Sequence, residues 1–330
     1  MKVIDMHCDT ISELHKDHLQ GGSSSILENS LMIDLKKMQA GDYGLQNFAL
    51  FTSLERAEGK PFEYCMGLLD TFYTEMEAHS DMIGIVRSYR DIEDNWRKGR
   101  MSALLTIEEG GVCQGSLRFL RDFYRLGVRM MTLTWNFPNE LGFPNKRERR
   151  EDGTTYLVPD QSNGLTGTGI EFVEEMERLG MIIDVSHLND AGIWDVFRHT
   201  KKPFVASHSN ARAVCPSLRN LTDDRVRRLA ERGGCMGLNY YDKFLVDGGS
   251  KDPEVLWEAL IRQARHITDV GGMEILGLGS DFDGIPTNPA LPGAEAMPVL
   301  WDRLKTAGFT ENQLDGIFWG NVMRVYRDAL

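Results

Sequence analysis

Eight short apolar runs alternate with longer stretches of helical periodicity, and this alternation constrains the fold more than any other feature of the sequence. The runs have the length and β-branched content of buried strands, and they cover residues 3–5, 45–50, 103–107, 128–134, 181–185, 204–206, 236–239 and 275–278. Apolar residues at helical spacing lie between them, for example in residues 67–79, 116–126, 169–179, 190–199, 223–232 and 252–270. Strands that alternate with helices form parallel β-α-β units, and a count near eight predicts a closed (β/α)8 TIM barrel rather than an open doubly wound sheet.

The length of the chain is compatible with one large barrel or with two ordinary domains. At roughly 150 residues per domain, the 330 residues do not decide between them. The Ser-rich segment 21–25 is too short for a domain linker, so we predict a single domain over residues 1–330. A content of 42% hydrophobic and 26% charged residues is typical of a soluble globular protein.

The charge balance argues against nucleic acids and membranes as partners. The 37 Lys and Arg residues against 49 Asp and Glu residues leave a net charge of −12, which repels phosphate backbones and anionic lipid surfaces. The sequence has no signal-peptide pattern and no apolar run near the roughly 20 residues that a membrane span needs. We therefore expect a cytoplasmic protein, and the general frequency of homodimers makes a homodimer the expected assembly.

The cysteines are few and scattered, which limits the chemistry that a metal site could use. The five are Cys8, Cys65, Cys113, Cys215 and Cys235. An odd number without any Cys-x-x-Cys pair argues against a disulfide framework and against a thiolate zinc site. We expect reduced, mostly buried thiols, so any metal ligands would have to be His, Asp and Glu.

Residues 136–168 form the longest stretch without a clear period. The stretch follows a predicted strand, contains several Pro and Gly residues, and includes a charged run at residues 146–152. Structureless loops of this length are uncommon in compact domains unless they bind something. The segment is therefore either a lid that contacts substrate or a solvated surface excursion, and the sequence favours neither.

Two predicted strands end in residues that can bind a metal ion. His7 and Asp9 lie at the end of the first strand, where the period of two projects both side chains to the same side. Glu108 and Glu109 end another apolar run, and carboxylates buried there need a cation or hydrogen-bond donors as partners. Each pair also has a plain interpretation, as a chance pairing or as two solvated acids at the start of a loop.

Three further strand ends carry side chains suited to the same site. The runs 181–185 and 204–206 are each followed by a Ser-His pair, which supplies His187 and His208. Consecutive strands of a barrel end at one rim, so the two imidazoles should approach each other, and neutral imidazole is a good ligand for Zn²⁺. The eighth run leads to Asp281, which could exchange a proton with metal-bound water. The whole set suffices for two ions that share one bridging carboxylate.

The ordered set of these motifs resembles the membrane dipeptidase (renal dipeptidase) family of metallopeptidases, a branch of the amidohydrolase-like barrels. The resemblance covers nearly the whole chain and rests on six motifs, His7-x-Asp9, Glu108-Glu-Gly-Gly, Ser186-His187, Ser207-His208-Ser, Arg219-Asn220 and Gly279-Ser-Asp281-Phe-Asp-Gly. It implies a site for two zinc ions, and other divalent metals would suit the same ligands. The implied ligands are His7 and Asp9 for one ion, His187 and His208 for the other, and Glu108 as the bridge, with Glu109 as the alternative bridge.

The resemblance also implies roles for side chains around the metals. Arg219 would pair with the terminal carboxylate of the substrate, a task that suits a planar guanidinium. Asp281 would transfer protons, and Glu108 would act through the two metals that activate the attacking water. The sequence departs from mammalian-type members at Trp135, where they carry a substrate-contacting His. Trp135 or its neighbour Asn136 is then expected to contact substrate, since an indole N–H can still donate one hydrogen bond.

The predicted function is a zinc-dependent dipeptidase that hydrolyses short L,L or L,D dipeptides. The first alternative is a related metal-dependent amide or lactam hydrolase with an altered substrate pocket, and Trp135 is the residue that points to it. A metal-free barrel that serves as a binding or scaffold protein is a more distant alternative, because all the ligand-type residues are present. Bound metal separates them, with about two ions per chain for an enzyme and none for a scaffold.

Overall fold

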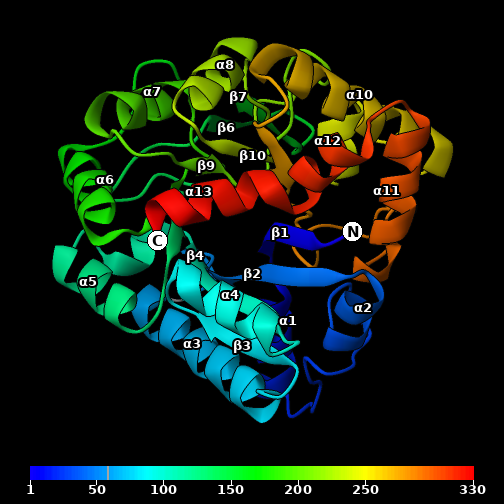
Figure 1. The fold of residues 1–330 in the computed structure, drawn as a ribbon. Coiled ribbons are helices and arrows are strands. Elements are labelled where there is room, and N and C mark those ends of the chain that lie inside the picture. The colour runs from blue at the N-terminus through cyan, green and yellow to red at the C-terminus, as the bar shows by residue number, and fades with distance from the viewer. Residues whose placement is uncertain (58) are drawn as a thin grey trace.

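The computed structural model describes residues 1–57 and 59–330, and a closed barrel of eight parallel strands lies at its centre (Figure 1). Around the barrel the order is β2, β1, β11, β10, β9, β8, β5 and β4, and pairing between β2 and β4 closes the ring. The strands are β1 (Val3–Cys8), β2 (Tyr43–Phe51), β4 (Met101–Glu108), β5 (Met130–Thr132), β8 (Ile182–Asp184), β9 (Val205–Ala206), β10 (Cys235–Leu238) and β11 (Leu276–Leu278). Each of the eight predicted runs overlaps one of these strands, so the predicted (β/α)8 barrel is confirmed.

The strands are apolar along most of their length because both of their faces are buried. One face of each strand fills the barrel and the other packs under helices. The strands therefore lack the alternation of apolar and polar residues that a half-buried strand shows. In β4, Leu104 belongs to the interior cluster, whereas its neighbours Ala103 and Leu105 belong to the cluster that packs outward. Every residue of β1 and β4 is buried, which is why they read as short continuous apolar runs.

Helices connect the strands and form the outer layer (Figure 1). They are α1 (Thr10–Leu19), α2 (Leu35–Ala40), α3 (Pro61–Ala78), α4 (Tyr89–Arg97), α5 (Leu117–Arg125), α6 (Gly167–Leu179), α7 (Asp190–His199), α8 (Asp223–Glu231), α9 (Asp242–Leu245), α10 (Pro253–Gly271), α11 (Met297–Thr306), α12 (Glu311–Asp315) and α13 (Asn321–Ala329), with short 3₁₀ or π turns η1 (Gly110–Cys113), η2 (Ala294–Ala296) and η3 (Gly316–Gly320). Side-chain caps fix several starts. For example, Asn189 accepts a hydrogen bond from the Gly192 N–H at the start of α7.

A ninth strand, β3 (Ile83–Val86), is absent from the sequence prediction. It pairs with residues 101–104, the first half of β4, while β5 pairs with residues 106–108 at the other end of that strand. The strand has four residues and includes Gly84, so it offers too little apolar periodicity to be distinguished from a turn. It extends the sheet beside β4 without entering the ring.

The amino-terminal end of the barrel is covered by α13, which crosses the front of the strands in Figure 1. Val322 and Tyr326 of this helix belong to the cluster that fills the barrel interior. The Tyr326 hydroxyl donates a hydrogen bond to Oδ1 of Asn47 on β2, at 2.9 Å. The carboxyl end of the barrel is therefore the end at which strand-end side chains can meet a ligand.

The long stretch 136–168 is not wholly irregular, which corrects the sequence interpretation. It contains an antiparallel hairpin of β6 (Lys146–Arg149) and β7 (Thr155–Val158), in register from Lys146 opposite Val158 to Arg149 opposite Thr155. Every residue of β6 is exposed and charged, so neither strand shows the apolar alternation on which strand prediction depends. The hairpin is held by its backbone ladder rather than by burial.

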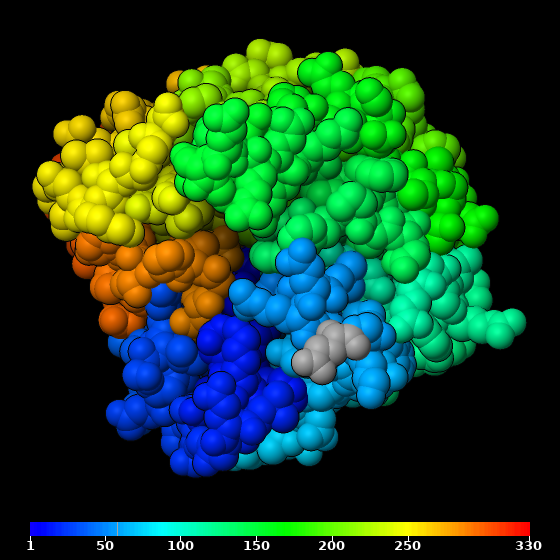
Figure 2. All heavy atoms as spheres, turned by 180° about the vertical axis from the view of Figure 1, so that it is seen from behind, coloured from blue at the N-terminus to red at the C-terminus, as the bar shows by residue number. Residues whose placement is uncertain are grey.

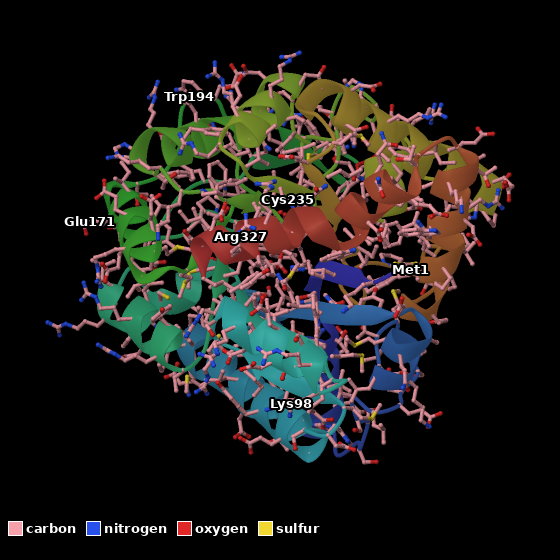
Figure 3. The ribbon with its side chains drawn as sticks, in the orientation of Figure 1. Met1, Lys98, Glu171, Trp194, Cys235 and Arg327 are labelled. Atoms are coloured by element: carbon pink, nitrogen blue, oxygen red, sulfur yellow. The ribbon has the colours of Figure 1, made fainter. Side chains whose placement is uncertain are left out.

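The cysteines agree with the expectation of buried thiols. All five are free and buried, and Figure 3 shows Cys235 near the centre of the molecule, in contrast to Lys98 and Glu171 at its rim. Among the helices of residues 1–57 and 59–330, none combines the length and apolar character required to cross a bilayer.

Candidate active site

The predicted site residues meet at the carboxyl end of the barrel. A cavity of about 330 Å³ opens there, and its lining includes Asp9, Glu108, Trp135, His187 and Asp281. Figure 2 shows this face of the molecule, with a hollow between the N-terminal segments in blue and the C-terminal segments in orange. Six different strands deliver the side chains, because the parallel barrel directs all of their ends to one rim.

Glu108 lies at the centre of this group. Its Oε2 atom is 3.4 Å from Nε2 of His7. Its Oε1 atom is 2.9 Å from Nε2 of His187 and 3.6 Å from Nε2 of His208. The two oxygens of one carboxylate thus face different imidazoles, as a bridging ligand requires.

Glu109 faces away from the imidazoles. Its carboxylate accepts hydrogen bonds from the Gly111 N–H at 2.8 Å, from the Trp135 N–H at 3.0 Å and from the side-chain amide of Asn139. Its backbone is left-handed, with φ of 88°, which turns the side chain out of the direction of β4. Of the two adjacent acids, the structure brings only Glu108 into the cluster.

Two more carboxylates complete the surroundings of His7. Its Nε2 atom is 3.6 Å from Oδ2 of Asp9 and 3.8 Å from Oδ1 of Asp281. On the other side the His7 and His208 rings stack at 3.9 Å, and Nε2 of His208 is 3.1 Å from Nε2 of His187. Three imidazoles and three carboxylates therefore share one buried space.

The donors of this space fit a divalent metal. Nε2 of His7 and Oδ1 of Asp9 are buried and make no hydrogen bond within residues 1–57 and 59–330, and orphaned atoms of this kind cost roughly 1–3 kcal/mol each. The ligand atoms of His7, Glu108 and His208 lie within 4.8 Å of one another. The same holds for a second set, His7, Asp9 and Asp281. Imidazole and carboxylate are the ligands that divalent metals take in open catalytic sites.

The whole chain, residues 1–330, matches the sequence model of the membrane dipeptidase family, peptidase family M19. The chain belongs to this family. An uncharacterized dipeptidase of Schizosaccharomyces pombe is 32% identical over 311 residues, which cover 89% of this chain and 71% of that protein.

Two solved structures have the same fold as this chain. Dipeptidase AC, a metallopeptidase of family M19, is 27% identical with a TM-score of 0.89, and the match covers 100% of this chain and 98% of that one. A metallopeptidase from Rhodobacter sphaeroides, solved with a phosphinate mimic of L-Ala-D-Ala, has the same TM-score at 24% identity, over 100% and 99% of the two chains. The family match and the similarity to Dipeptidase AC confirm the expected metallo-dipeptidase.

Asp184 supports the site of this metallo-dipeptidase. The sequence patterns did not identify it as a functional residue. It accepts hydrogen bonds from the Ser186 N–H at 3.0 Å, from the Thr132 hydroxyl at 2.7 Å and from the Ser207 hydroxyl at 2.5 Å. Ser207 Oγ lies 2.7 Å from Nδ1 of His208. The available signal was a lone acid inside the apolar run 181–185, where a buried charge needs several partners.

Asn239 has a similar supporting role for Asp281. Its side-chain amide donates to Oδ2 of Asp281 at 2.9 Å. Asp281 and His187 both have left-handed backbones, with φ of 63° and 71°. Such conformations in residues other than Gly gather at functional sites, where the surrounding structure enforces them.

The cluster shifts the proton affinities of its own members. Burial lowers the pKa of His7, but the carboxylates of Glu108 and Asp9 outweigh it and raise that pKa well above its usual value. Burial lowers the pKa values of His187 and His208 well below the usual value, with the charges of Arg219 and His7 adding to the effect. Both shifts favour the neutral imidazole, which is the form that binds a metal ion.

Burial also raises the pKa values of the acids. The pKa of Glu108 is about 7, because burial and the charge of Asp9 outweigh the opposing effect of His7. The pKa of Asp281 is about 6 through burial, which the charge of His7 partly offsets. The carboxyl group of Asp281, with a pKa near neutrality, is suited to accept and return a proton.

Arg219 is buried close to His187 and His208, and among the described residues it forms no ion pair with a carboxylate. Its guanidinium donates to Oγ of Ser209 at 3.4 Å and to the carbonyl of His208 at 3.3 Å, while its Nε–H has no acceptor there. Burial lowers its pKa. A buried guanidinium with a free donor can receive an anionic ligand group.

Trp135 and Asn136 both line the cavity. The Trp135 ring packs against Phe51 at 4.9 Å and lies 6.2 Å from the ring of His187. Oδ1 of Asn136 lies 3.1 Å from Nδ1 of His187. The structure therefore sets Trp135 on the cavity wall, whereas the polar contact of Asn136 is to a predicted metal ligand.

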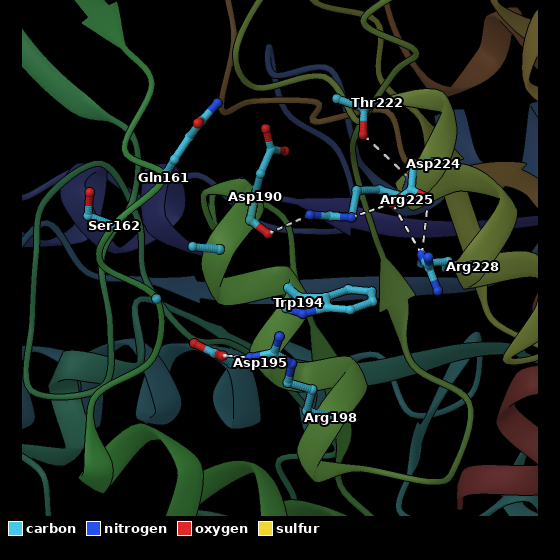
Figure 4. Close-up of a pocket in the computed structure, with 12 residues that line it drawn as sticks. Gln161, Ser162, Asp190, Trp194, Asp195, Arg198, Thr222, Asp224, Arg225 and Arg228 are labelled. Carbon is cyan, nitrogen blue, oxygen red and sulfur yellow. Dashed lines mark hydrogen bonds and ion pairs between the residues drawn. The ribbon is translucent and has the colours of Figure 1, made fainter.

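A larger cavity, of about 760 Å³, lies on the outer layer beside α7 and α8 (Figure 4). Arg225 and Arg228 point toward Asp224, and Arg228 Nε donates to its carboxylate at 3.1 Å. Three arginines surround the Trp194 ring, the closest being Arg228 at 4.6 Å from its centroid. The arginines already have aspartate partners, and the lining contains none of the predicted ligands.

Proposed function

We propose that this chain is a zinc-dependent dipeptidase that hydrolyses short L,L or L,D dipeptides at a centre of two metal ions. The observation that carries the proposal is the position of Glu108, whose two oxygens face His7 on one side and His187 and His208 on the other. His7 and Asp9 would hold one ion, and the other two histidines the second. Bound divalent ions would supply a water of lowered pKa and an electrophile for the peptide carbonyl.

The remaining residues have separate tasks in this proposal. Asp281, held by Asn239, would take a proton and deliver it to the departing amine, as its pKa of about 6 allows. Arg219 would bind the terminal carboxylate of the dipeptide through its unused Nε–H and its amino groups. Trp135 would bound the space for a substrate side chain, because its ring lies on the cavity wall.

The test is hydrolysis of L-Ala-D-Ala and L-Ala-L-Ala by zinc-loaded protein, with a chelated sample as control. The mimic of L-Ala-D-Ala bound by the Rhodobacter sphaeroides metallopeptidase makes the first dipeptide a reasonable choice. Turnover that the chelator abolishes and zinc restores is expected. Metal content of the active sample should be near two ions per chain, and a single ion at full activity would contradict the dinuclear centre.

A related amide or lactam hydrolase is the second candidate, because Trp135, which lines the cavity, stands where mammalian-type members of the family carry a His. The same experiment distinguishes the two. Protein that holds metal and turns over neither dipeptide, but cleaves another amide, would support the second candidate. A cytoplasmic location and a homodimer remain predictions, for which fractionation and the mass in solution are the measurements.

A further inference from the structure

We propose that Asn136 is a positioning residue for the metal centre. Its side-chain carbonyl accepts a hydrogen bond from Nδ1–H of His187 and so directs the Nε2 lone pair of that imidazole toward the metal ions. The proposal rests on the metal-dependent function above. It gives Asn136 a task different from the substrate contact that the sequence suggests.

The two nitrogens of the His187 ring have separate neighbours. Nδ1 lies 3.1 Å from Oδ1 of Asn136. Nε2 lies 2.9 Å from Oε1 of Glu108 and 3.1 Å from Nε2 of His208. A neutral imidazole carries one N–H, and a metal-binding nitrogen needs a free lone pair. With the proton on Nδ1, the Asn136 carbonyl accepts it and Nε2 is left for the metal.

Among the described residues, the side chain of Asn136 is the hydrogen-bond partner of Nδ1 of His187. His187 lies beyond the end of β8, with a left-handed φ of 71°. The ring of His208, by contrast, is fixed from the barrel, since its Nδ1 lies 2.7 Å from Oγ of Ser207, which in turn donates to Asp184. Metal-binding histidines generally have an acceptor for the second ring N–H. Asn136 supplies for His187 what Ser207 supplies for its neighbour.

The backbone that carries Asn136 is itself fixed. The N–H of Trp135 donates to Oε2 of Glu109 at 3.0 Å, and the Trp135 ring packs against Phe51 at 4.9 Å. Glu109 thus takes part in the site although it faces away from the metal ligands. It holds the residue next to Asn136, and Asn136 holds His187.

The experiment compares metal affinity, which a substrate contact would not change. The variants are Asn136→Ala, Asn136→Leu, which keeps the volume without the acceptor, and Asn136→Asp, which keeps an acceptor oxygen. Zn²⁺ affinity of the metal-free proteins is measured by competition with a chromophoric chelator, and the visible spectrum of the Co²⁺-loaded proteins reports the ligand geometry. Asn163→Ala is the matched control, because Asn163 lies in the same stretch of residues 136–168 and its side-chain amide donates to Asp160.

The Ala and Leu variants are expected to bind at least one Zn²⁺ about 10- to 100-fold more weakly, with an altered Co²⁺ spectrum. The Asp and Asn163 variants should match the wild type. The proposal would be overturned if both the Ala and the Leu variant had the metal affinity and the Co²⁺ spectrum of the wild type. A raised KM with unchanged metal binding would show instead that Asn136 contacts the substrate. Wild-type protein that binds Zn²⁺ but cleaves no dipeptide would refute the proposed activity alone, because the affinities would still decide the role of Asn136.

Discussion

At the scale of single residues, the site depends on the direction in which each side chain leaves the backbone. Glu108 and Glu109 are adjacent and both buried, yet one faces three imidazoles and the other faces backbone N–H groups. Burial raises the pKa of Glu109 to about 7, although the side chain of Asn139 opposes the shift. Glu108 and Glu109 therefore have similar raised pKa values but different roles, and only the direction of each side chain distinguishes them.

The first prediction concerns this pair of acids. Glu108→Gln should weaken metal binding and lower kcat/KM by a factor on the order of 100 or more, because a neutral amide cannot serve as an anionic bridge between two cations. Glu109→Gln leaves the cluster around Glu108 intact and keeps one of the two oxygens that accept from Gly111 and Trp135, so it should change kcat/KM by less than about tenfold. Steady-state kinetics and metal content check both variants. Full activity in Glu108→Gln would move the bridge to Glu109 or refute the dinuclear centre.

The second prediction concerns Gly284, where a side chain has no room. A Cβ at this position would collide with Oδ2 of Asp9 and lie 2.6 Å from Oδ1 of Asp281. Gly284→Ala should therefore displace both carboxylates and lower kcat/KM by a factor on the order of 10 to 100, with a similar loss of metal affinity. Gly167→Ala is the control, because nothing lies within 4 Å of the Cβ there. Equal kinetics for the two variants would contradict the assignment of Asp9 and Asp281 to the site.

At the scale of elements, charged contacts join neighbouring helices of the outer layer. Glu175 on α6 accepts hydrogen bonds from Nε and a terminal nitrogen of Arg178, at 2.6 and 2.8 Å, and from Nε of Arg121 on α5 at 2.5 Å. The hydrogen bonds from Arg178, followed by those from Arg121, outweigh burial and hold the pKa of Glu175 at about 2. This carboxylate connects α5 to α6.

The third prediction follows from that pKa. The folded value lies below the usual 4.5, so the contribution of Glu175 to stability is complete above pH 4.5 and is lost as the pH falls toward 2. Glu175→Gln should cost about 1 kcal/mol at pH 7, since Arg178 is exposed and Arg121 is partly exposed, and less at pH 3. Urea unfolding at both pH values measures this difference. Glu171→Gln, exposed on the same helix (Figure 3), is the control, and an equal loss at both pH values would contradict the prediction.

At the scale of the whole molecule, the closed barrel places its first strand, β1, beside its last strand, β11. β1 pairs with β11, so His7 from the first strand lies 3.8 Å from Asp281 after the last. The amino-terminal end is closed by α13, and the interior of the barrel there is packed with apolar side chains. The polar cluster is thus confined to one rim of a scaffold whose packing does not depend on it.

The fourth prediction concerns metal removal. Chelation should abolish activity and leave the far-UV circular dichroism unchanged, because the apolar core lies away from the cluster. For each bound ion, zinc at 100 times its dissociation constant should stabilise the fold by about 2.7 kcal/mol, which for a chain of this size raises Tm by several degrees. Thermal unfolding with and without zinc measures the shift. No shift in protein that is shown to bind zinc would place the metal away from the described cluster.

The sequence by itself determined the eight barrel strands and the chemical types at their ends. A strand buried on both faces must be apolar, and parallel strands must end at one rim. His7, His187, His208 and Asp281 could therefore be assigned to a common site before any coordinate was known. The same reasoning failed for β3 and for the hairpin β6–β7, because short or exposed strands leave no apolar period to detect.

Only the tertiary structure decided which neighbour of a pair faces the metal and what holds each ligand. The choice of Glu108 over Glu109 depends on a left-handed backbone at φ of 88°, which no periodicity encodes. The supporting roles of Asp184 and Asn136 depend on contacts across the barrel rim, between residues up to 52 positions apart in sequence. Sequence patterns report burial and direction along one element, whereas hydrogen bonds between elements exist only once the barrel is closed.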